Sequence, residues 1–144
     1  MDTRFSSAIH ILIMIAKAET PMTSDQIAKS VGTNASYIRK ITGLLKKKGI
    51  IESRQGISGF KLLIEPDELS LLRIYQAIGE TNQVHVFDLH QNPNDECIVG
   101  RHIRPVLTDV FRGIEEKAEQ ELKATTLAEC MKKMKTEIDK ERNI

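Results

Sequence analysis

The sequence is poor in cysteine and in aromatic residues, and it lacks a long apolar run. Its two cysteines, Cys97 and Cys130, are too few for a disulfide framework, which predicts a protein of the reducing cytoplasm. No stretch of about 18 apolar residues occurs, so we expect no transmembrane helix. The apolar run near the start is followed by Glu19 and Thr20 rather than by a small-residue cleavage site, which argues against a secretory signal.

The sequence also lacks a catalytic constellation. Its second half holds no paired carboxylates, no Ser/His/Asp set and no phosphate-binding loop, so we predict that the protein is not an enzyme. No two of its candidate metal ligands have the tight spacing of a metal site, and we expect neither a metal nor a cofactor. The candidates are His85, His90, Cys97 and His102.

Charge is distributed unevenly along the chain. Residues 1–64 hold ten Lys and Arg against four Asp and Glu, a net charge of +6. Residues 65–144 hold eleven against sixteen, a net charge of −5, and the two halves sum to the overall +1. A basic half joined to an acidic half indicates that one end meets a polyanion.

The periodicity of apolar residues predicts a mainly α fold with one small β-hairpin. A nearly all-apolar helix over 5–18 precedes two short helices. The first lies between Thr23 and Gly32, and the second is capped by Asn34 and ends at Gly49. Thr23 with Gln26 forms a predicted capping box, and the two glycines end their helices.

Two short strands, a further helix and a long helix complete the predicted fold. The strands over 50–54 and 60–64 flank a glycine-bearing turn, and Ser70 caps a helix that ends at Gly79. An irregular stretch leads to a long amphipathic helix over 99–123, with Pro105 expected in its first turn or at a kink. Thr126 and Glu129 form a second predicted capping box that opens a last helix.

This order of elements predicts a winged helix-turn-helix with a long dimerisation helix. We expect a DNA-binding domain over residues 1–80, a sensory or linker loop over 81–98, and the dimerisation and C-terminal helices over 99–144. The pattern indicates a transcription regulator that binds specific sequences of double-stranded DNA, and we expect it to act as a repressor. The alternative is a winged-helix adaptor that binds proteins and no DNA.

The second helix of a helix-turn-helix enters the major groove with its N-terminal residues at the base edges. Asn, Ser and Ala at that end can read bases, and the following cations can read guanine or hold phosphate. For Thr23 and Ser24, simple helix capping is an equal alternative to phosphate binding. For the lysines at 46–48, a solvated helix end is an equal alternative to DNA contact. The predicted contacts are Thr23, Ser24, Asn34, Ala35, Ser36, Tyr37, Arg39, Lys40 and Lys46.

The hairpin is the second predicted contact, because a narrow and negative minor groove attracts arginine. Arg54, Gln55 and Ser58 are its candidate residues, although a plain surface hairpin would have the same sequence. The long helix offers a dimer seam, for which packing within the chain is the alternative. The predicted seam comprises Ile103, Leu107, Val110, Phe111, Ile114, Ala118 and Leu122.

Several short motifs resemble the Rrf2 family of bacterial winged-helix transcription regulators. They include Tyr37-Ile38-Arg39-Lys40, the Leu44–Ile51 helix exit and Gly59-Phe60-Lys61-Leu62, within a resemblance that spans about residues 4–122. The segment from Asn92 to Gly100 is similar to the YwnA-like branch. The resemblance implies a homodimer on a pseudo-palindromic operator, with a sensory segment before the long helix.

In cluster-binding members of this family the sensory segment carries three closely spaced cysteines. Here it carries only Cys97, so the resemblance does not extend to an iron–sulfur cluster. The wing is also shorter than is usual in the family. Cys97 is left as a candidate redox sensor, since a helix N-terminus lowers a thiol pKa, whereas Asp95 and Glu96 raise it. The alternative is a small buried residue that anchors the loop.

Overall fold

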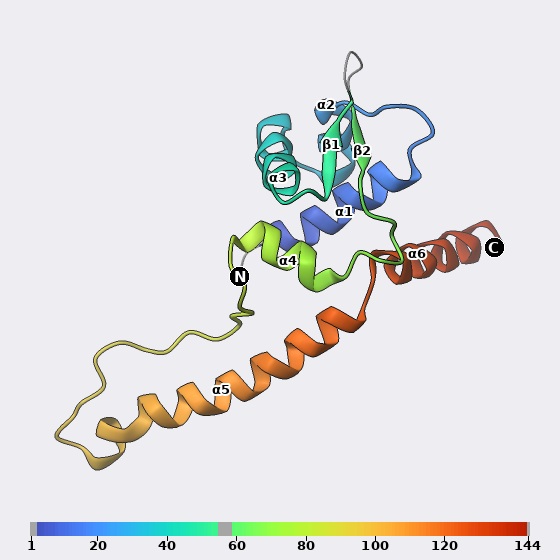
Figure 1. Cartoon of the computed structure of the whole chain (residues 1–144). Coiled ribbons are helices and arrows are strands. Elements are labelled where there is room, and N and C mark those ends of the chain that lie inside the picture. Colours follow the sequence, from blue (N-terminus) through green and yellow to red (C-terminus); the bar gives the residue numbers. More distant parts are fainter. Residues whose placement is uncertain (1–2, 55–58, 144) are drawn as a thin grey trace.

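The computed structural model describes residues 3–54 and 59–143, and in these it contains six helices and one two-stranded sheet (Figure 1). This arrangement confirms the predicted mainly helical class with a small hairpin. The helices are α1 (Arg4–Lys17), α2 (Ser24–Val31), α3 (Ala35–Lys47), α4 (Leu71–Gly79), α5 (Ile98–Ala124) and α6 (Leu127–Arg142). The strands are β1 (Ile51–Ser53) and β2 (Phe60–Leu62).

The predicted helix caps are present with one exception. The Thr23 hydroxyl accepts from the N–H of Gln26 and the Gln26 side chain accepts from the N–H of Thr23, which completes the capping box of α2. At α6 the Thr126 hydroxyl accepts from the N–H of Glu129, which is only half of the predicted box. Each such cap contributes about 1 kcal/mol by pairing helix N–H groups that would otherwise lack partners.

The core is built around α1. Ala8, Ile11 and Leu12 are fully buried, and Ile13 and Ile15 on other sides of the same helix are buried as well. The nearly all-apolar sequence of this helix predicted burial on two sides. Confirming this, α1 packs against α2, α3, α4 and β2, and it also contacts α6 from the far end of the chain.

The start of α6 is fastened to the segment before α4. The N–H of Leu127 donates to the Leu69 carbonyl at 2.9 Å, and the N–H of Ala128 donates to the Pro66 carbonyl at 3.0 Å. In return the N–H of Leu71 donates to the carbonyl of Thr125 at 2.9 Å. Since Leu127 is also fully buried, α6 begins inside the core of the winged-helix part.

Helix α5 projects from this core, and the loop over 80–97 runs beside it and turns back into its N-terminus (Figure 1). Its 27 residues span about 40 Å at the usual helical rise. Pro105 lies inside α5 and past its first turn, which excludes the first of the two expected positions and leaves the alternative of a kink untested. The helix continues through it and loses one backbone hydrogen bond, because proline has no N–H.

Within the described ranges, no helix is both long and apolar enough to cross a lipid bilayer.

Candidate nucleic-acid interface

Helix α3 has a buried apolar inner face and an exposed polar outer face. Ile38, Ile41 and Leu45 are fully buried and fix the rotation of the helix against the core. This rotation leaves exposed four of the α3 residues predicted to meet DNA, Ser36, Arg39, Lys40 and Lys46, together with Gly43 and Lys47.

Asn34 is engaged as a helix cap. Its side-chain oxygen accepts from the N–H of Tyr37 at 2.9 Å, as the predicted capping requires. Reading adenine bidentately needs both the oxygen and the amide group of an asparagine. In this conformation only the amide group of Asn34 is left to donate to a base. Ala35 and Tyr37 are half-buried, and Tyr37 packs against the core.

A hollow of about 510 Å³ joins the start of α2, the outer face of α3 and the hairpin. Arg39 and Lys46 supply two cations to it, and Lys46 Nζ donates to Ser53 Oγ at 3.3 Å. Hydroxyl groups and cations gathered at a helix N-terminus suit a phosphate. The lining residues are Thr23, Ser24, Asp25, Arg39, Thr42, Lys46, Ser53, Gly59 and Phe60.

The hairpin continues this surface. Strands β1 and β2 are antiparallel, with Ile51 opposite Leu62 and Ser53 opposite Phe60. Arg54 is exposed beyond β1, and its N–H donates to the carbonyl of Gly59 at 3.1 Å. The other two predicted wing residues, Gln55 and Ser58, lie outside the described residues.

Gly43 is a feature of this face that the sequence analysis missed. It lies in the middle of α3 on the exposed side, and a Cβ built on it would meet no atom within 4 Å. Glycine inside a helix costs about 1 kcal/mol relative to alanine, so its presence here needs a reason. A bare backbone lets another surface approach closely. The signal was available in the sequence as an isolated glycine within a helical pattern.

The predicted dimer seam on α5 divides into two sides. On one side, Val110 and Ile114 are 49% and 46% exposed. Val106, which was not part of the predicted seam, is 54% exposed and continues this side, because the three residues recur every four positions. Phe111 belongs to another side, where its ring lies 5.0 Å from that of Phe87 in the loop. The remaining predicted seam residues are half-buried: Ile103, Leu107, Ala118 and Leu122.

Glu115 fastens the loop to α5, and the sequence analysis missed this residue as well. Its carboxylate is only 6% exposed and accepts from the N–H of Val86 at 2.6 Å and from that of Phe87 at 3.4 Å. These bonds, that to Val86 first, lower the pKa of Glu115. The carboxylate is therefore charged at neutral pH, and the contact weakens only as the pH falls through that lowered pKa.

His85 lies beside this contact. Its Nε2 is 2.7 Å from the Asp88 carboxylate, and its Nδ1 is 3.6 Å from the Glu115 carboxylate. The hydrogen bond to Asp88 raises the pKa of His85. The hydroxyl of Tyr75 on α4 accepts from the N–H of His85 and donates to its carbonyl, so the loop is held to α4 as well as to α5.

Cys97 is exposed at the N-terminus of α5. The backbone N–H groups of Gly100 and Val99 lower the pKa of its thiol, although Sγ makes no capping hydrogen bond. The alternative role for Cys97, a small buried residue that anchors the loop, is excluded because its side chain is exposed. A side chain at Gly100 would collide with the carbonyl of Asn94, so glycine is needed where the loop meets the helix.

A helix pair with a polar second helix, followed by a basic hairpin, defines a winged helix-turn-helix. The chain belongs to the Rrf2 family, whose family model, described as an iron-dependent transcriptional regulator, matches residues 1–133. The family model and the relative YwnA, described below, are those of transcriptional regulators and not of enzymes.

Individual relatives agree with this membership. YwnA of Bacillus subtilis, named as a candidate HTH-type transcriptional regulator, is 37% identical over 131 residues, which cover 91% of this chain and 96% of YwnA. A solved structure of a candidate DNA-binding protein is 34% identical, with a TM-score of 0.69 and coverage of 89% and 98%. A candidate transcriptional regulator from Lactobacillus plantarum shares the fold, with a TM-score of 0.75, 23% identity and 99% coverage of both chains.

The iron in the family's description does not fit the side chains found here. Over residues 3–54 and 59–143, no three His, Cys, Asp or Glu side chains gather in a way that could hold a metal ion. Cys97, the one cysteine of the loop, is exposed and apart from Cys130 on α6.

Replacing Gly43 by alanine separates stability from binding. Because the new methyl group meets open space inside a helix, Gly43→Ala is expected to raise the free energy of unfolding by about 0.5–1 kcal/mol. The same methyl group is expected to weaken binding to duplex DNA, because it holds α3 away from the groove. Urea denaturation and a fluorescence-anisotropy titration measure the two quantities. Affinity that is unchanged or higher would show that DNA does not approach α3 at Gly43.

Proposed function

We propose that the protein is a homodimeric transcription regulator that binds a pseudo-palindromic operator and acts as a repressor. The observation that carries this proposal is the hollow where Arg39 and Lys46 of α3 meet the start of α2 and the hairpin. Phosphate neutralisation by such cations supplies most of the sequence-independent affinity for DNA. Exposed polar residues at the start of α3 are placed to supply specificity. Repression requires only that the bound protein occupies the operator.

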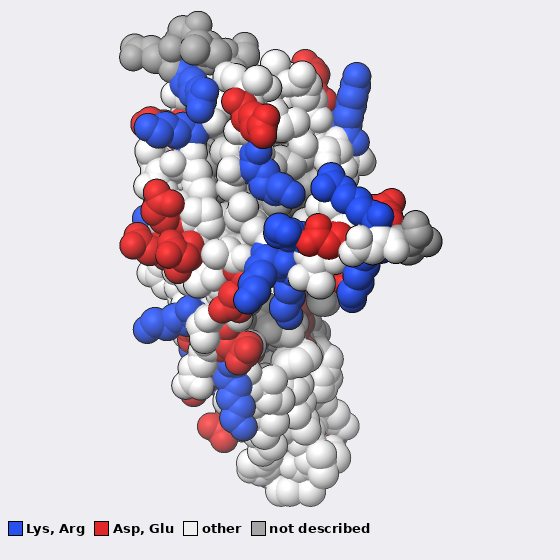
Figure 2. Space-filling model, turned by 90° about the vertical axis from the view of Figure 1, so that its right-hand side faces the viewer, with Lys and Arg blue, Asp and Glu red and all other residues white. Residues whose placement is uncertain are grey.

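The dimer is supported by the exposed side of α5. Three branched apolar side chains in a row are left uncovered there, although a second helix packed against them would remove them from water. Figure 2 shows that the lower end of the molecule, where α5 lies in Figure 1, carries few charged side chains on that face. A two-fold axis through α5 would place two copies of α3 on one DNA site, at half-sites about ten base pairs apart.

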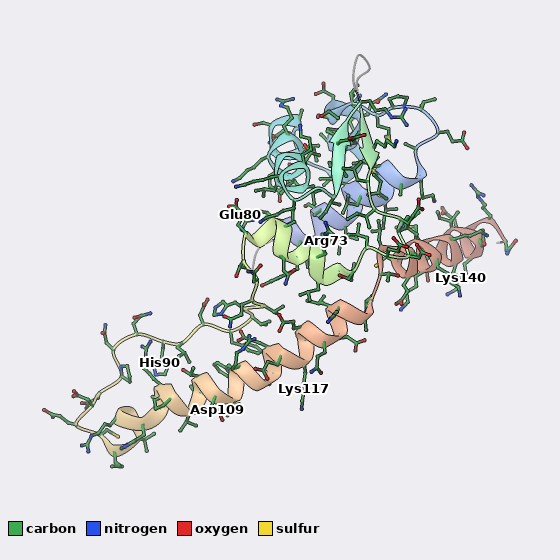
Figure 3. The ribbon with its side chains drawn as sticks, in the orientation of Figure 1. Arg73, Glu80, His90, Asp109, Lys117 and Lys140 are labelled. Atoms are coloured by element: carbon green, nitrogen blue, oxygen red, sulfur yellow. The ribbon has the colours of Figure 1, made fainter. Side chains whose placement is uncertain are left out.

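Arg39 tests the DNA interface. Arg39→Ala is expected to reduce operator affinity by about tenfold or more, because a cation at the α3 hollow is lost. The dimer should be unaffected, because Arg39 is not on α5. The measurement is an anisotropy titration of the upstream DNA at several salt concentrations. Lys140→Ala, on α6 at a distance from α3 (Figure 3), removes the same charge and should bind as the wild type does. Equal affinities of the two variants, or an affinity that is independent of salt, would contradict the proposal.

Val110 tests the dimer. Val110→Glu places a charge in the exposed apolar side of α5, where burial against a second copy would cost several kcal/mol. We expect the protein to become monomeric at micromolar concentration in sedimentation-velocity experiments and to lose most of its operator affinity. Gln120→Glu adds the same charge to an exposed position of α5 outside this apolar row, and it should remain dimeric. A Val110→Glu protein that sediments as a dimer would place the interface elsewhere.

Cys97 is proposed as a redox input to this regulator. Its thiol is exposed and the backbone amides of α5 lower its pKa, which increases the thiolate fraction at neutral pH. Hydrogen peroxide should therefore change the operator affinity of the wild type, and Cys97→Ser should abolish this change while leaving reduced-state binding intact. Cys130→Ser is the matched control and should keep the response. A response that survives in Cys97→Ser would remove Cys97 from the mechanism.

A further inference from the structure

A second hollow, of about 540 Å³, lies between the loop and α5. Its volume falls within the range of about 300–1,000 Å³ that is usual for small-molecule sites. The loop segment around His90 runs alongside α5 in Figure 3, so the walls come from two different parts of the chain. The lining residues are His85, Phe87, Asp88, Leu89, Gln91, Arg104, Thr108 and Phe111.

The hollow combines an aromatic wall with one cation. The rings of Phe87 and Phe111 lie 5.0 Å apart at 40°, and Phe87 is 41% exposed. Arg104 Nη1 donates to the carbonyl of His90 at 3.3 Å, which holds the guanidinium at the site. Within residues 3–54 and 59–143, no other protein group accepts a hydrogen bond from its remaining N–H groups.

The charges in the hollow favour an anion. The Asp88 carboxylate is paired with His85 at 2.7 Å, so these two side chains largely offset each other when His85 is protonated. His85 also lies 3.6 Å from the Glu115 carboxylate, which accepts from the N–H groups of Val86 and Phe87. Among the described residues Arg104 forms no ion pair with a carboxylate, so its guanidinium is the charge that can meet an anion in the hollow. Its planar guanidinium donates two parallel hydrogen bonds and matches the geometry of a carboxylate. Beside it lies apolar surface that prefers a hydrocarbon body to water.

This hollow is separate from the exposed apolar side of α5. Arg104, Thr108 and Phe111 recur at intervals of four and three residues along the side of the helix that faces the loop. Val106 and Val110 are exposed on a different side of α5, and neither lines the hollow. A second copy packed on that side would therefore leave the aromatic wall and Arg104 on the loop side of α5.

We propose that this hollow binds a small organic acid, with its carboxylate on Arg104 and a flat apolar body against Phe87 and Phe111. Such a ligand would contact the loop and α5 together. It would reinforce the connection that Glu115 already makes through the N–H groups of Val86 and Phe87. Binding of the acid stands on this geometry alone, and its use as an effector of DNA binding rests on the proposed regulator function.

Phenylacetate and its uncharged counterpart 2-phenylacetamide test the site by isothermal titration calorimetry on the full chain without DNA. Phenylacetate should bind saturably at low millimolar concentration, and the amide should bind about tenfold more weakly, because a charge-assisted pair is lost. Arg104→Gln should remove this preference, and Arg104→Lys should restore part of it. Lys123→Gln, which removes an exposed cation from the far end of α5, should behave as the wild type does.

Three results would overturn the site: no saturable binding of phenylacetate up to about 20 mM, equal binding of the acid and the amide, or a preference that persists in Arg104→Gln. The comparison of acid with amide uses the wild-type chain, so it does not depend on the folding of a variant. Because no DNA is present, failure here is distinct from failure of the proposed function, which the Arg39→Ala titration measures independently.

Discussion

Burial of α1 on nearly all sides is the constraint on which the rest of the molecule depends. Ile11, Leu12, Ile13 and Ile15 point in different directions around one helix, and all four are buried. Each side of α1 therefore needs its own cover, which α2, α3, α4, the hairpin and α6 supply. The rotation of α3 that exposes its polar face follows from this packing. So does the recruitment of Leu127, from near the end of the chain, into the same core.

The loop before α5 is coupled to α3 through α4. The hydroxyl of Tyr75 on α4 forms hydrogen bonds with the backbone of His85 in the loop. The ring of Tyr75 packs against that of Phe5 on α1, with the ring centroids 5.5 Å apart. At the C-terminal end of α4, the capping residue Glu80 pairs with Lys47 of α3 at 3.5 Å (Figure 3 labels Glu80). Surface pairs of this kind contribute little to stability. Nevertheless, the Tyr75–His85 and Glu80–Lys47 contacts connect the loop, through α4, to the C-terminal end of α3, the helix proposed to meet DNA.

Local features of the fold could be predicted from the sequence, and contacts between distant residues could not. The caps at Thr23, Asn34 and Ser70 were predicted correctly, because a cap involves residues only three apart. Glu115 was missed, because its partners lie 28 and 29 residues earlier and leave no periodic signal. The predicted seam on α5 merged two sides of the helix for the same reason. Only the position of the loop separates Phe111, which it covers, from Val110, which it does not.

Because α5 has one side toward the loop and another toward solvent, the proposed organic acid and a second copy of the chain would contact different residues of the helix. The loop side is polar at its centre, where the Glu115 carboxylate replaces water around two backbone N–H groups. A buried carboxylate of this kind is tolerated only while those donors stay in place. Any event that displaces Val86 and Phe87 therefore leaves a charge on α5 without its partners. The helix must then either admit water around the carboxylate or shift, and a shift would carry the exposed apolar side with it because both sides belong to one rigid element.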